Sequence, residues 1–247
     1  RSRMQGTKSI IDMNDEEVAA LSAAISERED RGWRHVGWKL GFGSPTGMET
    51  LGLTKPLVGA LFDAGREIPG ATIPCDHMWV PMVEPEIAAW VGGGTSANAS
   101  ADDLMSAISS LVPAIEVADV TFAPDSSVKV VRENIYQYGW TVADDDESGW
   151  AEVRGRTIDI TYGGEQWSQD DPESMTGSLV EGLVQCNDVA HRLGRGILAG
   201  DVVFLGSVIP PQPIREKRLE IHFLDGRGVS ATFTRSGGGQ EPIEEGS

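Results

Sequence analysis

The chain has 247 residues, 40% of them apolar, and a formal net charge of −18. This length and apolar content suit a folded protein with a substantial core and exclude a disordered chain. Binding to nucleic acid or to an anionic membrane needs clustered Lys and Arg. The sequence holds no such cluster, so neither is an expected partner.

Three features bear on the cellular location. No apolar run is long enough to span a bilayer. The opening residues RSRMQGTKSI lack the apolar core of a secretory signal. Cys75 and Cys186 have no metal-ligand spacing, so we interpret both as apolar packing residues in a reducing compartment. We therefore expect a cytoplasmic protein.

Three amphipathic segments predict helices. The first covers 14–30, where Asn14 or Asp15 can cap the N-terminus. The second begins at Ser100 and continues to residue 112. Its apolar face holds Leu104, Ile108 and Leu111. The third covers 177–196 and ends at a pair of glycines.

The rest of the chain predicts strands. Apolar or alternating runs occur at 79–91, 111–122, 134–143, 156–163, 201–209 and 218–233. The sequence DGRG at 225–228 predicts a hairpin turn. This pattern indicates one α+β domain rather than regular βαβ units. The expected parts are an N-terminal helical segment (1–31), a main domain (32–235) and a flexible tail (236–247).

The segment VEPEIAAWV at 83–91 carries two carboxylates in an apolar run. Side chains alternate along a strand, so Glu84 and Glu86 share one face. Pro85 cannot donate to a sheet ladder, which indicates an edge, a bulge or the mouth of a sheet. The motif alone fits a solvated strand face better than a cation site, because solvated faces are more common.

Glu116 changes this balance, because it lies among apolar neighbours in LVPAIEVADV. An unpaired glutamate in such a strand is costly. Three carboxylates offer only oxygen ligands, which suit Mg²⁺ or Mn²⁺. Zinc is not expected, since no His or Cys lies near them in the sequence. We therefore predict that Glu84, Glu86 and Glu116 converge on one metal ion.

Lys39 stands in the glycine-spaced apolar stretch HVGWKLGFGS. It is either a surface residue with its stem along apolar surface, or a cation directed into a pocket beside carboxylates. We expect Lys39→Met to leave the melting temperature nearly unchanged, because methionine keeps most of the stem's packing.

Five segments occur in the order and spacing of one enzyme family. They are GWKLGFGS, LGLTKPLVGALFD, VEPEIAAWV, LVPAIEVAD and LAGDVVFLGSVIPPQPI. Over residues 32–233 the chain resembles a branch of the fumarylacetoacetate hydrolase superfamily. That branch holds 2-keto-4-pentenoate (2-hydroxypentadienoate) hydratases and 2-oxo-3-hexenedioate (4-oxalocrotonate) decarboxylases. The resemblance implies a mixed β-sheet roll with peripheral helices, and a metal-dependent lyase of small 2-oxo acids in aromatic-compound catabolism.

The resemblance also implies roles for single residues. The implied ligands of Mg²⁺ or Mn²⁺ are Glu84, Glu86 and Glu116, and the implied active-site lysine is Lys39. The implied substrate-binding residues are Gly206, Ser207, Leu57 and Asn134.

Two departures from the family pattern matter. KPLVG replaces the QPDFG typical of the hydratases, so Leu57 stands where they carry Asp. Hydration needs an acid/base group that leucine cannot supply, so the sequence leans slightly toward decarboxylation. The segment before Lys39 is also short, so we expect a reduced lid or one supplied by a neighbouring subunit. Together with the apolar strands, this predicts a homodimer or a larger assembly.

Other interpretations stay open. C–C hydrolases of the superfamily use a His and a Glu on a short helix after the glycine motif. GFGSPTGMET holds no His, and Glu49 alone cannot form that pair. A degenerate member could serve as a non-catalytic partner in a hydratase–decarboxylase complex, although the intact glutamates and lysine argue against it. An acidic β-rich binding domain without metal is the remaining alternative.

Overall fold

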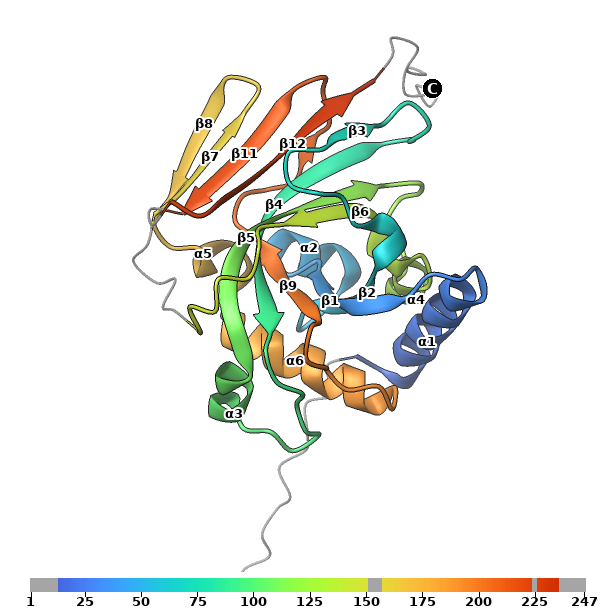
Figure 1. The fold of residues 1–247 in the computed structure, drawn as a ribbon. Coiled ribbons are helices and arrows are strands. Elements are labelled where there is room, and N and C mark those ends of the chain that lie inside the picture. The colour runs from blue at the N-terminus through green and yellow to red at the C-terminus, as the bar shows by residue number, and fades with distance from the viewer. Residues whose placement is uncertain (1–12, 151–156, 224–225, 236–247) are drawn as a thin grey trace, which may run out of the picture.

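The structure contains two β-sheets (Figure 1). The computed structural model describes residues 13–150, 157–223 and 226–235. In this part of the chain, the larger sheet has the strand order β2-β1-β9-β4-β5-β6, and β10 pairs with β4. Its strands are β1 (His35–Gly41), β2 (Leu57–Phe62), β4 (Pro81–Val91), β5 (Ile108–Asp119), β6 (Gln137–Val142), β9 (Val202–Ser207) and β10 (Gln212–Pro213).

The smaller sheet has the order β3-β12-β11-β7-β8. Its strands are β3 (Thr72–Pro74), β7 (Ile158–Tyr162), β8 (Glu165–Gln169), β11 (Arg218–Phe223) and β12 (Gly228–Thr234). Most neighbouring strands are antiparallel, but β1 pairs with β9, and β3 with β12, in parallel. The structure thus confirms the predicted α+β class with mixed sheets.

Helices lie around the larger sheet (Figure 1). They are α1 (Asp15–Asp30), α2 (Pro45–Leu51), α3 (Ala101–Ser106), α4 (Ser127–Arg132), α5 (Glu173–Thr176) and α6 (Leu179–Arg192), with the 3₁₀ segments η1 (Asp63–Gly65) and η2 (Asn134–Tyr136). Within the described residues, no helix has the length and apolar character needed to cross a membrane.

The larger sheet curls until its end strands, β2 and β6, are bridged by side chains. Trp140 on β6 donates from Nε1 to the Phe62 carbonyl oxygen of β2 at 3.0 Å. Asn134, which precedes β6, accepts from Ala60 N and donates to Ala60 O, both at 2.8 Å. These bonds produce the half-closed roll that the resemblance implies.

Of the two predicted caps, Asn14 is the one that caps helix α1, and it does so in a complete capping box. Asn14 Oδ1 accepts from Glu17 N at 2.9 Å, and the Glu17 carboxylate accepts from Asn14 N at 2.8 Å. Leu21 and Ile25 are fully buried and join α1 to the common core. Residues 1–12 and the predicted tail, 236–247, lie outside the described residues.

The predicted second helix is correct at its start and wrong at its end. Ser100 and Asp103 form a complete capping box. However, α3 ends at Ser106, and Ile108 and Leu111 belong to β5. Nearly the whole length of β5 pairs with β4. The hydrogen bonds of that long ladder stabilise the strand more than the helical spacing of a short apolar stretch stabilises a helix.

The third predicted helix and the predicted hairpin are confirmed. Ser178 caps α6 by accepting from Glu181 N at 3.4 Å, and Gly194 beyond its end has a φ of +71°. Strands β11 and β12 form the hairpin, closed by a 2.8 Å bond from Phe223 N to Arg227 O. Residues 224–225 of the turn lie outside the described residues.

Replacing Asn14 with alanine should lower the free energy of unfolding by about 1 kcal/mol, because Glu17 N loses its side-chain acceptor. Glu17 also accepts from Ser127 Oγ at 2.6 Å, which ties α1 to α4. Urea denaturation followed by tryptophan fluorescence measures the change. Asn14→Asp keeps an acceptor and is the control. Equal losses in the two variants would contradict the capping role.

Candidate functional site

One cavity of about 300 Å³ lies against the larger sheet. Its lining includes Lys39 from β1, Glu84 and Glu86 from β4, and Glu116 from β5. Lys39 is 2% exposed, and Glu86 and Glu116 are each 1% exposed. The curl of the sheet therefore brings the four predicted charged residues into one largely buried space.

The pairing of β4 with β5 fixes the arrangement of the glutamates. Glu84 lies directly opposite Glu116, while Glu86 lies two residues along β4, opposite Ala114. Alternation along the strands therefore puts the three carboxylates on one face. Like charges directly opposite each other destabilise a sheet, and burial adds to the cost. This arrangement calls for positive charge nearby.

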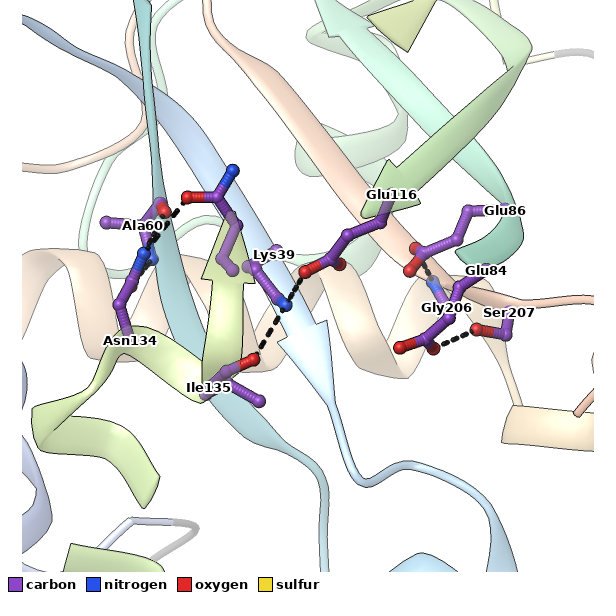
Figure 2. A network of polar contacts seen from close by, with 10 residues as sticks. Lys39, Ala60, Glu84, Glu86, Glu116, Asn134, Ile135, Gly206 and Ser207 are labelled. Carbon is purple, nitrogen blue, oxygen red and sulfur yellow. Dashed lines mark hydrogen bonds and ion pairs between the residues drawn. The ribbon is translucent and has the colours of Figure 1, made fainter. Parts of the chain in front are cut away.

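Lys39 supplies one positive charge. Its Nζ forms an ion pair with Glu116 Oε1 and donates to the Ile135 carbonyl oxygen at 3.4 Å (Figure 2). Gly59 lies opposite Lys39 on β2, and a Cβ added there would be 3.1 Å from Lys39 Cγ. The small residue leaves room for the lysine stem. Of the two sequence interpretations, the buried cation matches the structure.

The other two carboxylates accept hydrogen bonds from β9. Gly206 N donates to Glu86 Oε2 at 3.2 Å, and Ser207 Oγ donates to Glu84 Oε2 (Figure 2). Gly206 has a φ of +126°, and a Cβ there would be 2.6 Å from Thr176 Oγ1, so glycine is needed. Gly206 and Ser207 both line the cavity, beside the carboxylates.

Burial raises the pKa of the two inner carboxyls. The pKa of Glu86 lies well above its ordinary value, first through loss of hydration and then through the charges of Glu116 and Glu84. Loss of hydration also raises the pKa of Glu116 to about 7, against the opposing effect of Lys39. Such carboxyls hold a proton near neutral pH unless further positive charge stabilises the ionised form.

These donors fit a hard divalent cation in their chemistry, since Mg²⁺ and Mn²⁺ prefer oxygen ligands. Their like charges on one face of the sheet and the raised pKa values of Glu86 and Glu116 also favour a bound cation. Across the described ranges, however, no three His, Cys, Asp or Glu side chains are gathered closely enough to hold an ion. Glu116 is turned to Lys39 and Glu84 to Ser207. Convergence of the three glutamates on one ion therefore stays a prediction.

Two residues of the implied substrate-binding set do not line the cavity. Leu57 is fully buried in the core, so it does not stand where a substrate would meet an acid or a base. The Asn134 side chain is held by the backbone of Ala60. Asn134, Ile135 and Tyr136 have φ values of +54°, +54° and +59°. These three residues form η2, so the strand predicted at 134–143 begins only at Gln137. Asn134 thus holds the segment whose Ile135 carbonyl accepts from Lys39.

Several lining residues carried no recognisable signal in the sequence. They include Phe42, Ser44, Met82, Tyr136, Met175 and Thr176. Thr176 Oγ1 is buried and has no hydrogen-bond partner among the described residues. Thr176 lies at the end of the short helix α5, where no periodic pattern marks its direction. Only the folded structure could identify it as a polar group of this site.

Comparison with known proteins gives a consistent result, although no family model matches the chain. The 2-keto-4-pentenoate hydratase of Burkholderia vietnamiensis is 32% identical over 235 residues, which cover 87% of this chain and 86% of that protein. A 4-oxalocrotonate decarboxylase of a Pseudomonas species is 25% identical over 220 residues, covering 85% of this chain and 84% of the relative.

A solved structure supports the same relationship at the level of the fold. The 4-oxalocrotonate decarboxylase from Pseudomonas putida G7, complexed with magnesium and adipate, superposes with a TM-score of 0.78. The match covers 88% of this chain and 85% of that one at 20% identity. Sequence and fold agree over most of both chains. The protein therefore belongs to the hydratase and decarboxylase branch of the fumarylacetoacetate hydrolase superfamily.

Proposed function

We propose that this protein is a divalent-metal-dependent lyase that acts on small 2-oxo acids. The observation that carries the proposal is the gathering of three glutamates and one lysine in a single cavity, with Glu86, Glu116 and Lys39 buried. A fold does not need such a costly group of charges, whereas a site that binds a cation and an anionic substrate does. The 32% identical hydratase supports the same class of reaction.

Glu84, Glu86 and Glu116 would hold the metal, with Mg²⁺ or Mn²⁺ favoured by the oxygen-only donors. A divalent cation bound there would supply Lewis-acid stabilisation of negative charge on the oxygens of a 2-oxo acid. Lys39 stabilises negative charge that develops on the substrate and can deliver a proton to it. The Ile135 carbonyl and Glu116 hold the Lys39 ammonium in place for both roles.

Two reactions are compatible with this machinery. Hydration of a 2-oxo-4-enoate breaks the C4–C5 double bond and adds hydroxide at C4 and a proton at C5. Decarboxylation of a 2-oxo-3-enedioate breaks the C5–C6 bond, releases CO₂ and leaves the electron pair in the conjugated 2-oxo system. The lean toward decarboxylation rested on Leu57. Because Leu57 lies outside the cavity, it no longer favours either reaction.

The alternatives are less well supported. A C–C hydrolase of this superfamily would need a His and a Glu on α2, but that helix holds no His. Glu49 is exposed and is not among the lining residues. A non-catalytic partner would not need to keep buried carboxylates beside a buried lysine, since such groups reduce stability without a ligand.

Calorimetric titration with Mg²⁺ and with Mn²⁺ tests the metal site. We expect binding to the wild type and at least tenfold weaker binding to Glu86→Gln, because loss of even an outer-shell partner costs about 10–100-fold in affinity. Glu49→Gln is the matched control, since Glu49 is exposed outside the cavity. Equal affinities in the two variants would exclude Glu86 as a ligand.

Lys39→Met should lower kcat by about 10²–10³, because one preorganised positive charge is removed from the site. The assay follows the ultraviolet absorbance of 2-oxo-enoates and the release of CO₂, with Mg²⁺ present. Lys129→Met is the control, since Lys129 lies on α4 with a side chain that is 51% exposed. Wild-type turnover in Lys39→Met would remove the catalytic assignment and leave the metal site standing.

The expected effect of Lys39→Met on stability is revised, because Lys39 pairs with a buried carboxylate. The folded pKa of Glu116, about 7, exceeds its ordinary value of 4.5. Protonation of Glu116 therefore stabilises the metal-free protein below pH 4.5, and this stabilisation is lost as pH rises through 7. Lys39 lowers the pKa of Glu116, so in the variant this pKa lies higher still and the variant continues to lose stability at pH values where Glu116 of the wild type is already ionised. Its melting temperature should fall more at pH 8 than at pH 5.5, and an equal fall would contradict the pairing.

We also propose that the protein forms a homodimer or a larger assembly. Exposed apolar side chains gather near β6, since the Tyr138 ring contacts the tilted ring of His77, with centroids 5.3 Å apart, and Trp79 follows closely in the chain. The exposed fractions are 76% for Ile68, 68% for Trp79, 53% for Val80 and 41% for Tyr138. Contact between subunits would remove this apolar surface from water. Light scattering at micromolar concentration should give at least a dimer mass, and a monomer mass would contradict the proposal.

A further inference from the structure

The cavity changes from charged to apolar along β4 and β5. Glu84 and Glu116 form one cross-strand pair, and Met82 and Ala118 form the next pair on the same face. Val120 follows just beyond the end of β5 and also lines the cavity. Exposure rises in this direction along both strands. On β4, Glu86 is buried whereas Glu84 and Met82 are half-buried, and on β5, Glu116 and Ala118 are buried whereas Val120 is half-buried. The apolar pair therefore lies toward the mouth.

Further apolar residues line the cavity, among them Phe42, Met175 and Pro211. We call these three residues, together with Met82, Ala118 and Val120, the outer wall. Phe42 lies 6.4 Å, between ring centroids, from Tyr136. The Tyr136 hydroxyl donates to the Phe122 carbonyl oxygen at 2.9 Å, so its proton is already engaged.

Positive charge is confined to the inner part of the cavity. Three glutamates and one lysine give the lining a formal charge of −2, which one divalent cation would cancel. Among the described residues that line the cavity, Lys39 is the only Lys or Arg, and Glu116 already pairs with it. The outer wall therefore offers no counter-charge to a second anionic group.

A 2-oxo acid that binds at the glutamates reaches the outer wall. Two residues along an antiparallel strand span about 7 Å, which separates the Glu84–Glu116 pair from the Met82–Ala118 pair. Four C–C bonds of about 1.5 Å join C2 to C6, so an extended chain places C6 roughly 5 Å beyond C2. A carboxylate at C6 would lose water against apolar side chains and gain no positively charged partner.

We propose that this protein selects 2-oxo acids whose far end is uncharged and apolar over dicarboxylates of the same length. The inference rests on the proposed function and names its substrate class. It favours hydration, because decarboxylation at C6 requires a second carboxylate. An apolar wall can also promote the departure of a carboxylate by removing its water, so turnover has to be compared as well as binding.

The first test compares two unreactive ligands of equal length. Calorimetry of the wild-type protein in saturating Mg²⁺ should show 2-oxohexanoate binding at least tenfold more tightly than 2-oxohexanedioate, since the second carboxylate is desolvated without a partner. The kcat/KM for 2-oxopent-4-enoate should likewise exceed that for 2-oxohex-3-enedioate.

The outcomes separate the inference from the function beneath it. Equal or tighter binding of the dicarboxylate, or a higher kcat/KM for the enedioate, would overturn the inference and leave the lyase proposal intact. Failure of both saturated ligands to bind in Mg²⁺ would overturn the proposed function and, with it, the inference.

A variant of the outer wall gives the second test. Met82 does not belong to the buried core, so its replacement is compatible with folding. Met82→Arg adds a cation where C6 is expected and should shift the affinity ratio toward the dicarboxylate by about tenfold. Met82→Leu is the apolar control and should leave the ratio unchanged, because it adds neither charge nor a hydrogen-bond donor. Wild-type ratios in Met82→Arg, with Mg²⁺ binding retained, would contradict this placement of the far end.

Discussion

The gathering of three glutamates, two of them buried, around a single buried lysine is the constraint on which the rest of this structure depends. The β4–β5 ladder places Glu84 opposite Glu116, and the curl of the sheet brings Lys39 across from β1. One ammonium cannot balance three carboxylates where two of them, Glu86 and Glu116, have almost no contact with water. Small residues beside the lysine and the bonds from β9 hold these groups together despite that imbalance.

Local chemistry made part of the fold predictable. Asn14 could be identified as a cap because its amide competes well for free N–H groups at a helix start. The same kind of signal located Ser100, but it could not locate the end of that helix. Whether Ile108 continues a helix or begins a strand depends on β4, a partner that lies elsewhere in the chain. Residues 134–136 take left-handed conformations that no propensity favours for isoleucine or tyrosine.

The site was predictable to the extent that it follows strand alternation. Glu84 and Glu86 share a face because they are two residues apart, and the apolar context of Glu116 indicated a buried partner. The motif position of Leu57 did not reveal that its side chain points into the core, since a motif fixes place along the chain and not direction. The role of Thr176 could not be predicted from the sequence, because the helix α5 that brings it to the cavity is too short to show a periodic pattern.

The bridge between β2 and β6 has a consequence for association with other chains. End strands of a sheet usually offer unpaired N–H and C=O groups on which further strands can assemble. Here the side chains of Asn134 and Trp140 occupy such groups on Ala60 and Phe62. The segment around Ile135, whose carbonyl oxygen accepts from Lys39, therefore also protects the edge of the sheet from pairing with further strands. Loosening it would expose template edges for amyloid-like growth at the same time as it disturbed the charged cavity.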